Sequence, residues 1–386
     1  MIAPPMRLAI YTDYPYHRID GQVYAERAFA IFLARLAPQF ESLTLIGRLT
    51  PGPAPARYPL GDRVEFVSLP YYRKLSQPLP VLKALAGSIR RYWRALEDVD
   101  CVWLLGPHPF AIVFAALAKL RGKQIALGVR QDLPEYVRNR HPDRRLMRLA
   151  AGALELAFRT LGRSCSVVAV GPKLAHNYRR SRHLLRLTVS LVDEGEVVPP
   201  ASRKLDYGKE LKVLSVGRLD PEKNPLLLAD VLALLERDEP GRWTLAICGE
   251  GSMADQLERR LSELGVRDRA DLSGYVSHSS LARMYSQCHL LLHVSWTEGL
   301  PQVLFEAFAA ALPVTATDVG GVAEATAGAV SLIPAGDAAA AAKALRELAG
   351  DRALRERRAL AGNAIVRAST IQAEVSRLAE FLSTEP

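Results

Sequence analysis

The segment Glu298-Gly-Leu-Pro-Gln-Val-Leu-Phe-Glu306 carries two carboxylates separated by seven residues. It follows a short apolar run, and Pro301 suits the first turn of a helix. We therefore expect Glu298 in the loop above a helix N-terminus and Glu306 inside that helix, both facing one crevice. Amides at such a terminus bind phosphate or sugar hydroxyls, and carboxylates accept hydrogen bonds from hydroxyls, so the combination suits a nucleotide sugar. The alternative is a solvated helix face, which the spacing alone does not exclude.

A second candidate turn runs from Val216 to Pro225 with the sequence Val-Gly-Arg-Leu-Asp-Pro-Glu-Lys-Asn-Pro. Gly217, Arg218 and Lys223 follow a predicted strand, and doubly wound sheets bind ligands outside the carboxyl ends of their strands. The Arg218 guanidinium matches phosphate oxygens and the Lys223 ammonium acts as a point charge, so the pair suits a leaving nucleoside diphosphate. Cations on one loop are more often solvated, but two such loops at one sheet edge favour a site.

Three further turns give weaker support. Gly249 and Val276 each lie just beyond a predicted strand, where a glycine turn allows close approach of a base or sugar. Each is by itself an ordinary turn between a strand and a helix. His108, in Gly-Pro-His-Pro-Phe, follows a predicted strand of the first half. A lone histidine is usually structural, but this position makes His108 a candidate contact to the sugar or the acceptor.

Strands must position these turns, and short Val-, Ile- and Leu-rich runs alternate with amphipathic stretches along the chain. The alternation predicts βαβ units and an α/β fold with parallel sheets. The predicted strands of the first half are 6–11, 43–47, 64–68, 101–105, 124–129, 166–170 and 187–191. A polar, proline-bearing segment from Pro199 to Lys204 precedes a second series at 211–217, 243–248, 270–274, 289–294, 313–315 and 330–333.

The two series predict two doubly wound, Rossmann-like domains. We expect residues 1–198 to form the first domain and residues 199–365 the second. Residues 366–386 are expected to form a C-terminal helix that packs back on the first domain.

Composition excludes several classes of protein. Of 386 residues, 49% are hydrophobic and 24% charged, which provides apolar surface for buried cores and excludes a disordered or fibrous chain. No uncharged apolar run reaches about eighteen residues, and no basic segment followed by a long apolar one opens the chain, so we expect a soluble, cytoplasmic protein. The cysteines are scattered singly, so we expect buried thiols at Cys101, Cys165, Cys248 and Cys288.

The net charge of +9 is unevenly distributed. Residues 1–198 hold 29 basic and 16 acidic side chains, whereas residues 199–386 hold 21 and 25. Such asymmetry predicts an anionic partner, which is a nucleic acid, an acidic lipid surface or a phosphorylated small molecule. The sequence has no basic stripe interleaved with stacking aromatic residues, so we expect no nucleic acid.

The second half resembles the retaining family 4 glycosyltransferases of the GT-B fold. The motifs that carry the resemblance are VGRLDPEKNP, ICGEGSMADQLE and LSGYVSHSSLARMYSQCHLLLHVSWTEGLPQVLFEAFAAALPVTATDVGGVAE, and they extend from residue 211 to about 335. The resemblance implies two Rossmann-like domains that face each other across a cleft, with helices at the C-terminus. It also implies that residues 1–198 bind the acceptor and residues 199–365 bind a nucleotide-sugar donor.

By this resemblance Arg218 and Lys223 contact the donor diphosphate and Glu306 binds the ribose hydroxyls. Glu298 would hold hydroxyls of the donor sugar, and His108 would lie close to the transferred sugar. The expected catalytic set is therefore His108, Arg218, Lys223 and Glu298. Further donor contacts are expected at Gly21, Gly217, Gly249, Val276, Gly299, Leu300 and Pro301.

The first half departs from the family pattern at two places. The family has a Gly-Gly pair after its first strand, whereas the matching stretch is Ile19-Asp-Gly-Gln-Val23, in which only Gly21 can serve. The Asn-Gly-Val-Asp hinge of the family corresponds to Ser190-Leu-Val-Asp193. These departures bear mostly on the acceptor and the hinge.

The resemblance implies a hexosyltransferase that moves a sugar, with retention, from a UDP- or GDP-sugar to an acceptor hydroxyl. No cofactor and no metal are expected, because the donor is a substrate and two cations stabilise its leaving group. Asp98-Val-Asp100 matches the metal-binding Asp-x-Asp motif of other transferases, but it ends a basic helix, where acidic residues commonly serve as solvated loop groups. Two alternatives are a nucleotide-sugar epimerase of the same fold and a non-catalytic nucleotide-sugar-binding subunit.

Basic residues in the first half bear on the acceptor. They lie with aromatic residues between Tyr71 and Lys74, at Lys83 and between Arg90 and Arg94, and they recur at residues 138–148. We expect an anionic or hydroxyl-rich acceptor, with peripheral contact to the inner face of a membrane as the alternative.

Overall fold

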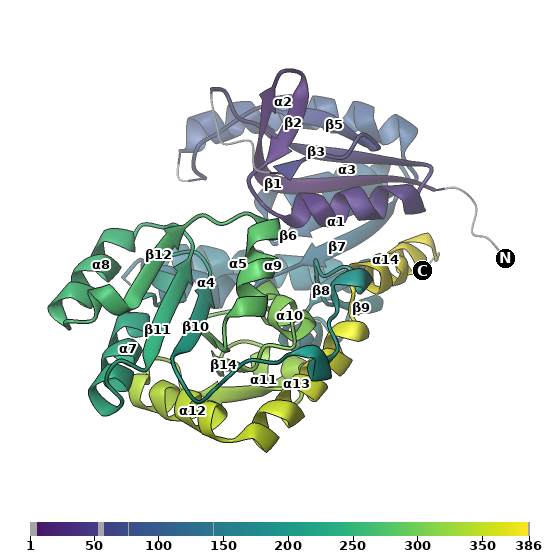
Figure 1. The fold of residues 1–386 in the computed structure, drawn as a ribbon. Helices are drawn as coiled ribbons and strands as arrows, with labels where there is room; N and C mark the ends of the chain where they lie inside the picture. Colours follow the sequence, from purple (N-terminus) through teal and green to yellow (C-terminus); the bar gives the residue numbers. More distant parts are fainter. Residues whose placement is uncertain (1–5, 53–57, 76, 142, 385–386) are drawn as a thin grey trace. The chain divides into compact units, whose positions relative to one another are not determined.

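The computed structural model describes residues 6–52, 58–75, 77–141 and 143–384. Contacts between Cα atoms divide the chain into two compact units (Figure 1). Unit 1 comprises the chain up to Pro134, residues 144–189 and the chain from Ile371 onwards. Unit 2 comprises residues 135–143 and 190–370. Each unit is built on one β-sheet.

Unit 1 contains a nine-stranded sheet with β1 near its centre. The strands are β1 (Arg7–Ile19), β2 (Gln22–Ala25), β3 (Ser42–Leu49), β4 (Tyr58–Pro59), β5 (Val64–Leu69), β6 (Cys101–Gly106), β7 (Gln124–Val129), β8 (Ser166–Val170) and β9 (His183–Leu187). β1 pairs in parallel with β3 and β6, and β7, β8 and β9 follow β6 in parallel order. Their continuous apolar runs suit strands covered on both faces.

The helices of unit 1 are α1 (Phe29–Leu36), α2 (Pro78–Ala95), α3 (Pro109–Leu120), α5 (Arg145–Gly162), α6 (Pro172–Asn177) and α14 (Ile371–Ser383). α3 contacts both α2 and α5, and their core includes Tyr92 stacked on Phe114 with ring centroids 4.1 Å apart. The C-terminal α14 contacts α1 and β9. The buried Glu374 carboxylate of α14 accepts a hydrogen bond from the Thr188 amide at 2.9 Å, which fixes this helix to unit 1.

Two strands of unit 1 differ from the sequence-based expectation. β1 continues far beyond residue 11, because Asp20 (φ 49°) and Gly21 (φ 81°) form a two-residue turn that returns the chain as the antiparallel β2. Gly21 therefore lies in a hairpin turn of unit 1. The strand expected at 187–191 is instead β9, which ends at Leu187. The next residues leave the sheet, and the Ser190 hydroxyl accepts a hydrogen bond from the Val192 amide.

Unit 2 contains six parallel strands in the order β12-β11-β10-β13-β14-β15. Their bounds are β10 (Leu211–Val216), β11 (Trp243–Cys248), β12 (Ala270–Gly274), β13 (Leu290–His293), β14 (Val314–Thr317) and β15 (Val330–Ile333). This is the doubly wound order in which the two halves of a sheet run outward from a switch point. The switch point lies between β10 and β13, and its crevice is the expected ligand site.

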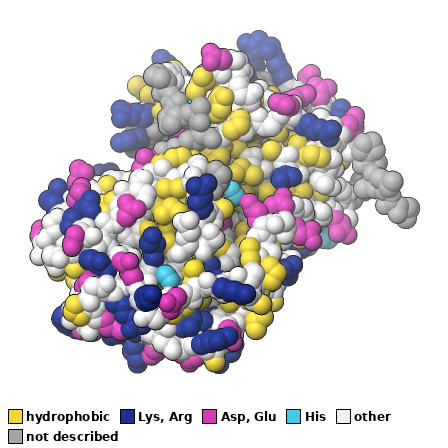
Figure 2. All heavy atoms as spheres, viewed as in Figure 1, with side chains coloured by type: hydrophobic (Ala, Val, Ile, Leu, Met, Phe, Trp, Pro, Cys, Tyr) yellow, Lys and Arg dark blue, Asp and Glu magenta, His cyan; other side chains and the backbone are white. Residues whose placement is uncertain are grey.

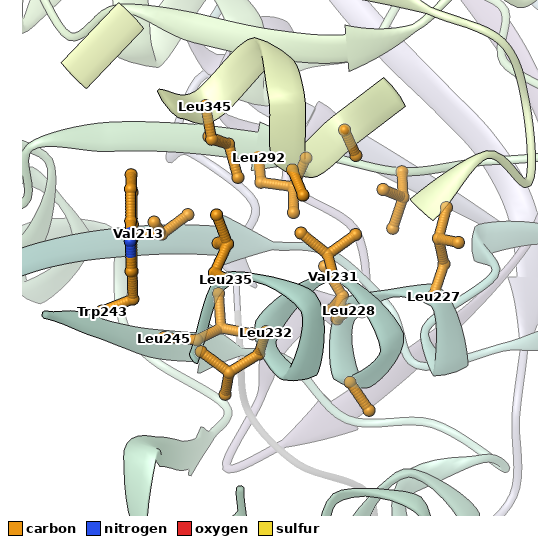
Figure 3. Packing of buried hydrophobic residues seen from close by; sticks show 14 of the residues in the cluster. Val213, Leu227, Leu228, Val231, Leu232, Leu235, Trp243, Leu245, Leu292 and Leu345 are labelled. Atoms are coloured by element: carbon orange, nitrogen blue, oxygen red, sulfur yellow. The ribbon is translucent and has the colours of Figure 1, made fainter. Parts of the chain in front are cut away.

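The helices grouped with unit 2 are α4 (Leu133–Arg140, from residue 135), α7 (Leu226–Asp238), α8 (Ala254–Glu263), α9 (His278–Gln287), α10 (Gln302–Ala309), α11 (Val322–Thr326), α12 (Ala338–Gly350) and α13 (Arg352–Arg367). On one face of the sheet, Val231 and Leu235 of α7 pack toward Val213 and Leu245, with Leu345 of α12 nearby (Figure 3). A second cluster contains much of α10 and parts of β13 and β14. Both faces of this sheet are therefore buried.

The linker after β9 belongs to unit 2, so the unit boundary lies between Val189 and Ser190, earlier along the chain than residue 199. Val192 and Val197 join the core beside α10, and the Val198 amide donates to the Ala309 oxygen at 2.8 Å. The C-terminal helix expected at 366–386 is α14, which begins at Ile371. The first residues of the expected range belong to the preceding helix, because α13 ends at Arg367.

All four cysteines are free and buried, which confirms the sequence-based expectation. Among the helices of the described ranges, none combines the length and the apolar character that crossing a bilayer requires.

The turns after β10 and β11 pack so closely that a side chain does not fit between them. A Cβ on Gly249 would lie 1.8 Å from the Gly217 carbonyl oxygen, and a Cβ on Gly251 would lie 2.3 Å from the Leu219 oxygen. The Leu219 amide also donates to the Glu250 oxygen at 2.9 Å. The β11 turn thus supports the turn that carries Arg218.

We expect Gly251→Ala to lower the free energy of unfolding by about 1–3 kcal/mol, because the two turns must separate to admit the methyl group. The matched control is Gly350→Ala at the end of α12, where a Cβ would meet no described atom within 4 Å apart from its chain neighbours and the backbone of its own helix. Its effect should stay within about 0.5 kcal/mol. Urea unfolding of both variants measures the difference, and equal stabilities would contradict the close approach of the turns.

Candidate functional site

Arg218, Lys223 and Glu298 lie on the turns after β10 and β13, which flank the switch point of the unit 2 sheet. Hydrogen bonds tie these two turns together. The Trp296 amide donates to the Glu222 carbonyl oxygen at 2.9 Å, and the Ser295 hydroxyl oxygen lies 3.2 Å from the same carbonyl oxygen. The side chains of each turn are therefore held in register with those of the other.

Lys223 and Glu298 form an ion pair across this junction, with 2.5 Å between Nζ and Oε1. The Ser295 hydroxyl (2.8 Å) and His293 Nε2 (3.0 Å) donate to the same Glu298 oxygen. The Glu298 side chain is only 7% exposed, and burial alone would raise its pKa. The charge of Lys223 and the His293 hydrogen bond outweigh burial and hold the pKa at about 2, so the carboxylate is charged.

Glu222 holds two arginines beside this pair. Its nearly buried carboxylate accepts from Arg218 Nη2 at 2.7 Å and from Arg140 Nη1 at 3.0 Å, both through Oε1. Arg218 also forms an ion pair with Asp220. Arg140 comes from α4, where the Tyr136 hydroxyl accepts a further hydrogen bond from it at 3.0 Å.

Arg140 belongs to the basic first half of the sequence, but the structure groups it with unit 2, where it contacts Glu222 on the turn after β10. It precedes β10 by about seventy residues, and no spacing pattern connects the two segments. A small cavity of about 20 Å³ beside this cluster is lined by residues that include Gly217, Arg218, Lys223 and His293. The structure thus joins three expected site residues with one, His293, that sequence reasoning missed.

Glu306 lies in a different environment. α10 begins at Gln302, so Glu306 is a full turn inside the helix and meets Tyr285 of α9, whose hydroxyl donates to Oε2 at 2.7 Å. Burial raises the pKa of Glu306, although the Tyr285 hydrogen bond opposes this effect. Glu306 lines a cavity of about 530 Å³ with His278 and with residues of the linker between 192 and 205. Glu298 does not line this cavity, so the single crevice expected for both carboxylates is not formed there.

The remaining donor-site candidates lie on the expected turns. The Gly249 amide donates to the Gly274 oxygen at 2.8 Å, so the turns after β11 and β12 are also connected. Val276 is half-buried and lies just before α9, against the core beside α10. Gly299 and Leu300 form the loop before α10, and Pro301 occupies the position that precedes its first helical residue.

His108 is buried in unit 1 at the start of α3. Its Nδ1 accepts a hydrogen bond from the Phe110 amide at 3.2 Å, and the Tyr11 hydroxyl lies 3.0 Å from the same nitrogen. The ring proton of the neutral form is therefore assigned to Nε2, which lies 3.1 Å from Asp13 Oδ2. The sequence pointed to His108 but gave no sign of these partners.

Asp13 is the charged centre of the His108 cluster. It also accepts from the Tyr72 hydroxyl and interacts with Arg48, whose Nε lies 3.2 Å from Oδ1. Burial opposes ionisation of Asp13, but the hydrogen bonds from His108 and Tyr72 and the charge of Arg48 lower its pKa. Asp13, Tyr72 and His108 lie far apart in the sequence, so only the folded sheet brings them together.

The Asp-x-Asp match has a structural explanation. Asp100 forms an ion pair with Arg7 at 2.8 Å and also accepts from the Arg7 amide at 2.9 Å, so it anchors the start of β1. In the described parts of the chain, no three His, Cys, Asp or Glu side chains are grouped closely enough to hold a metal ion.

The low pKa of Glu298 predicts a pH dependence of stability. A depressed carboxyl pKa stabilises the fold above the unfolded pKa of about 4.3, and this contribution is lost as the pH falls toward about 2. Glu298→Gln removes this titration, so the wild type should lose up to about 3 kcal/mol more unfolding free energy than the variant between these pH values. Urea unfolding at several pH values measures it, and parallel pH profiles would contradict the assignment.

Comparisons with known proteins agree with this architecture. Residues 201–365 match the family model described as Glycosyl transferases group 1. The chain is 30% identical over 228 residues to D-inositol 3-phosphate glycosyltransferase of Nocardia farcinica, covering 53% of this chain and 51% of that protein. It is 31% identical over 177 residues to mannosylfructose-phosphate synthase of Agrobacterium fabrum, covering 41% and 39%. These alignments span about half or less of each curated relative.

Solved structures match over almost the whole chain. Sucrose-phosphate synthase from Thermosynechococcus elongatus superposes with a TM-score of 0.75 at 17% identity, covering 97% of this chain and 98% of that one. Anabaena HepE in complex with UDP and glucose gives a TM-score of 0.71 at 17% identity, covering 98% and 100%. The two Rossmann-like units therefore have the GT-B fold, and unit 2 carries the segment that matches the group 1 glycosyl transferases.

Proposed function

We propose that the protein is a retaining, metal-independent glycosyltransferase that moves a hexose from a nucleoside-diphosphate sugar to an acceptor hydroxyl. The observation that carries this proposal is the meeting of the Arg218–Lys223 turn with the Glu298 turn at the switch point of the unit 2 sheet. That edge is where doubly wound sheets bind nucleotides. It lies within the residues that match the family model.

The cations of this junction suit the leaving group. Lys223 and Arg218 would contact the diphosphate, whose charge grows as the bond from the anomeric carbon to the phosphate oxygen breaks. Glu222 and Glu298 hold both cations in place before the donor arrives, so little reorganisation is needed. These side chains would supply the charge stabilisation that a divalent metal supplies in other transferases.

The nucleoside is assigned to the neighbourhood of Glu306. A carboxylate there would accept hydrogen bonds from ribose hydroxyls, and Val276 would lie near the base. The proposed donor is a UDP- or GDP-sugar. UDP is tested first because the similarly folded HepE has been solved with UDP and glucose.

Retention requires the acceptor to attack from the face that the phosphate leaves. We propose a front-face substitution, in which the acceptor oxygen bonds to the anomeric carbon and its proton passes to the departing phosphate oxygen. Unit 1 would bind the acceptor, and His108 would lie near the transferred sugar. Two relatives are named for inositol phosphate and mannosylfructose phosphate, which supports an anionic, phosphorylated acceptor.

Two alternatives share the same donor site. An epimerase would convert one nucleotide sugar to another without an acceptor, and a binding subunit would hold the donor without turnover. The preorganised Lys223 and Arg218 cations favour a reaction that expels the diphosphate over either alternative.

The test begins with a thermal-shift panel of UDP, GDP and ADP, because a ligand of the native state raises the melting temperature. The sugar nucleotides of the best base are then incubated with and without sugar-phosphate acceptors, and NMR identifies released diphosphate, anomeric configuration and any epimerised donor. We expect diphosphate release and an α-linked product from an α-linked donor. An epimerised donor, an inverted product or binding without turnover would contradict the proposal.

Lys223→Ala should lower kcat by about a hundredfold or more, because a preorganised cation at the leaving group is lost. Lys343→Ala is the control, since Lys343 is 75% exposed on α12, and it should leave kcat unchanged. Equal turnover in both variants would remove Lys223 from the reaction. A thermal melt of each variant separates loss of fold from loss of chemistry.

A further inference from the structure

Two helices of unit 1 expose leucines on the side opposite to their buried face. α2 packs through Ala84, Ser88 and Tyr92, whereas Leu79 and Leu82 point away and remain 72% and 59% exposed. Leu75, which precedes the helix in the sequence, is also 48% exposed. A surface helix ordinarily presents polar side chains on its outer face. The packing of unit 1 therefore does not account for the outer leucines of α2.

α5 repeats this arrangement over a longer stretch. Its buried face contains Ala151, Glu155, Phe158 and Gly162. Leu146 (82% exposed), Leu149 (71%) and Leu156 (65%) form an outer stripe at spacings of three and seven residues, which place them on one side of a helix.

These leucines lie on one layer of the unit. α3 contacts both α2 and α5, so the three helices cover the same face of the sheet (Figure 1). Each helix links parallel strands and runs opposite to them, which places the N-terminal ends of all three at the carboxyl edge of the sheet. Leu79 and Leu146 both belong to first turns, so they lie at the same edge.

The charge around these leucines is almost entirely positive. The sequence from residue 66 to residue 96 contains no Asp or Glu, and its cations are Arg73, Lys74, Lys83, Arg90, Arg91 and Arg94. Arg144, Arg145 and Arg148 accompany Leu146 and Leu149 at the start of α5, with Asp143 as the one acidic residue between 136 and 154. By contrast, acidic and basic side chains are interspersed over unit 2 on the face drawn in Figure 2.

We propose that this leucine and arginine surface of α2 and α5 docks unit 1 on an anionic lipid bilayer. Leucines enter the boundary between headgroups and acyl chains, while the surrounding cations contact acidic headgroups. A second copy of the chain fits less well, because a two-fold dimer would bring this patch against itself and set like charges opposite one another. The inference concerns where unit 1 binds and does not depend on the donor chemistry.

Co-sedimentation with vesicles tests the surface. The full chain should bind vesicles of phosphatidylcholine mixed with phosphatidylglycerol, bind pure phosphatidylcholine vesicles weakly, and dissociate in high salt. Leu79→Ser combined with Leu146→Ser should lower the partition coefficient by about tenfold or more, since two apolar side chains no longer enter the bilayer. The control is Leu360→Ser, because Leu360 is 61% exposed on α13 of unit 2, and it should bind like the wild type.

A second pair of variants tests the charge. Arg73→Glu combined with Arg145→Glu should reduce binding to the acidic vesicles, whereas Arg259→Glu, at an exposed residue of α8 in unit 2, should have little effect. Vesicle binding that does not depend on acidic lipid, or full vesicle binding by the variant that combines Leu79→Ser with Leu146→Ser, would overturn the proposal. Self-association that Leu79→Ser abolishes, without lipid binding by the wild type, would assign the surface to a second copy instead.

Donor turnover without vesicles should be unchanged in the leucine variants, so failure here is distinguishable from failure of the proposed transferase activity.

Discussion

The ion pair between Lys223 and Glu298 is the contact on which the geometry of the unit 2 site depends. Both groups are largely removed from water, and a charge in that position is costly unless it is paired and hydrogen-bonded. Ser295 and His293 supply the additional hydrogen bonds to Glu298. Because each partner sits on a different turn, satisfying these charges also fixes the two sides of the switch point. The glycines of the β11 turn allow a third turn to pack against the same place.

Neighbouring charges extend this arrangement. Glu222 is the residue before Lys223, and it holds Arg218 from its own turn and Arg140 from α4. A net charge counted over each half of the sequence therefore differs from the net charge of each unit, because Arg140 lies in the first half of the sequence but belongs to unit 2. Other basic residues have structural partners, as Arg7 has in Asp100 and Arg48 has in Asp13. Around the exposed leucines of α2 the sequence from residue 66 to residue 96 contains cations and no acidic side chain, which makes that surface distinct from the turns that carry Arg218 and Glu298.

The sequence predicted the parallel strands well because strands buried on both faces are continuous apolar runs. The strands at 124–129, 166–170, 243–248, 270–274 and 330–333 have the predicted bounds. It also located the turns with Arg218, Lys223 and Glu298, whose residue types follow directly after such runs. It could not predict contacts that depend on folding. In the sequence His293 looks like the last residue of an apolar strand, and Asp13 and Tyr72 come close to His108 only when the sheet has formed. The extension of β1 was missed because it depends on the turn at Asp20 and Gly21.

The central claim is that a diphosphate binds at the Lys223–Glu298 junction and the nucleoside binds elsewhere, beside Glu306. Calorimetric titration of the wild type, Lys223→Met and the exposed control Lys343→Met with UDP and uridine, and with GDP and guanosine, tests it most directly. Loss of a charged hydrogen bond should weaken nucleoside-diphosphate binding to Lys223→Met by about tenfold or more, with nucleoside affinity unchanged. Equal losses for the nucleoside and its diphosphate, or unchanged binding of both, would contradict the account.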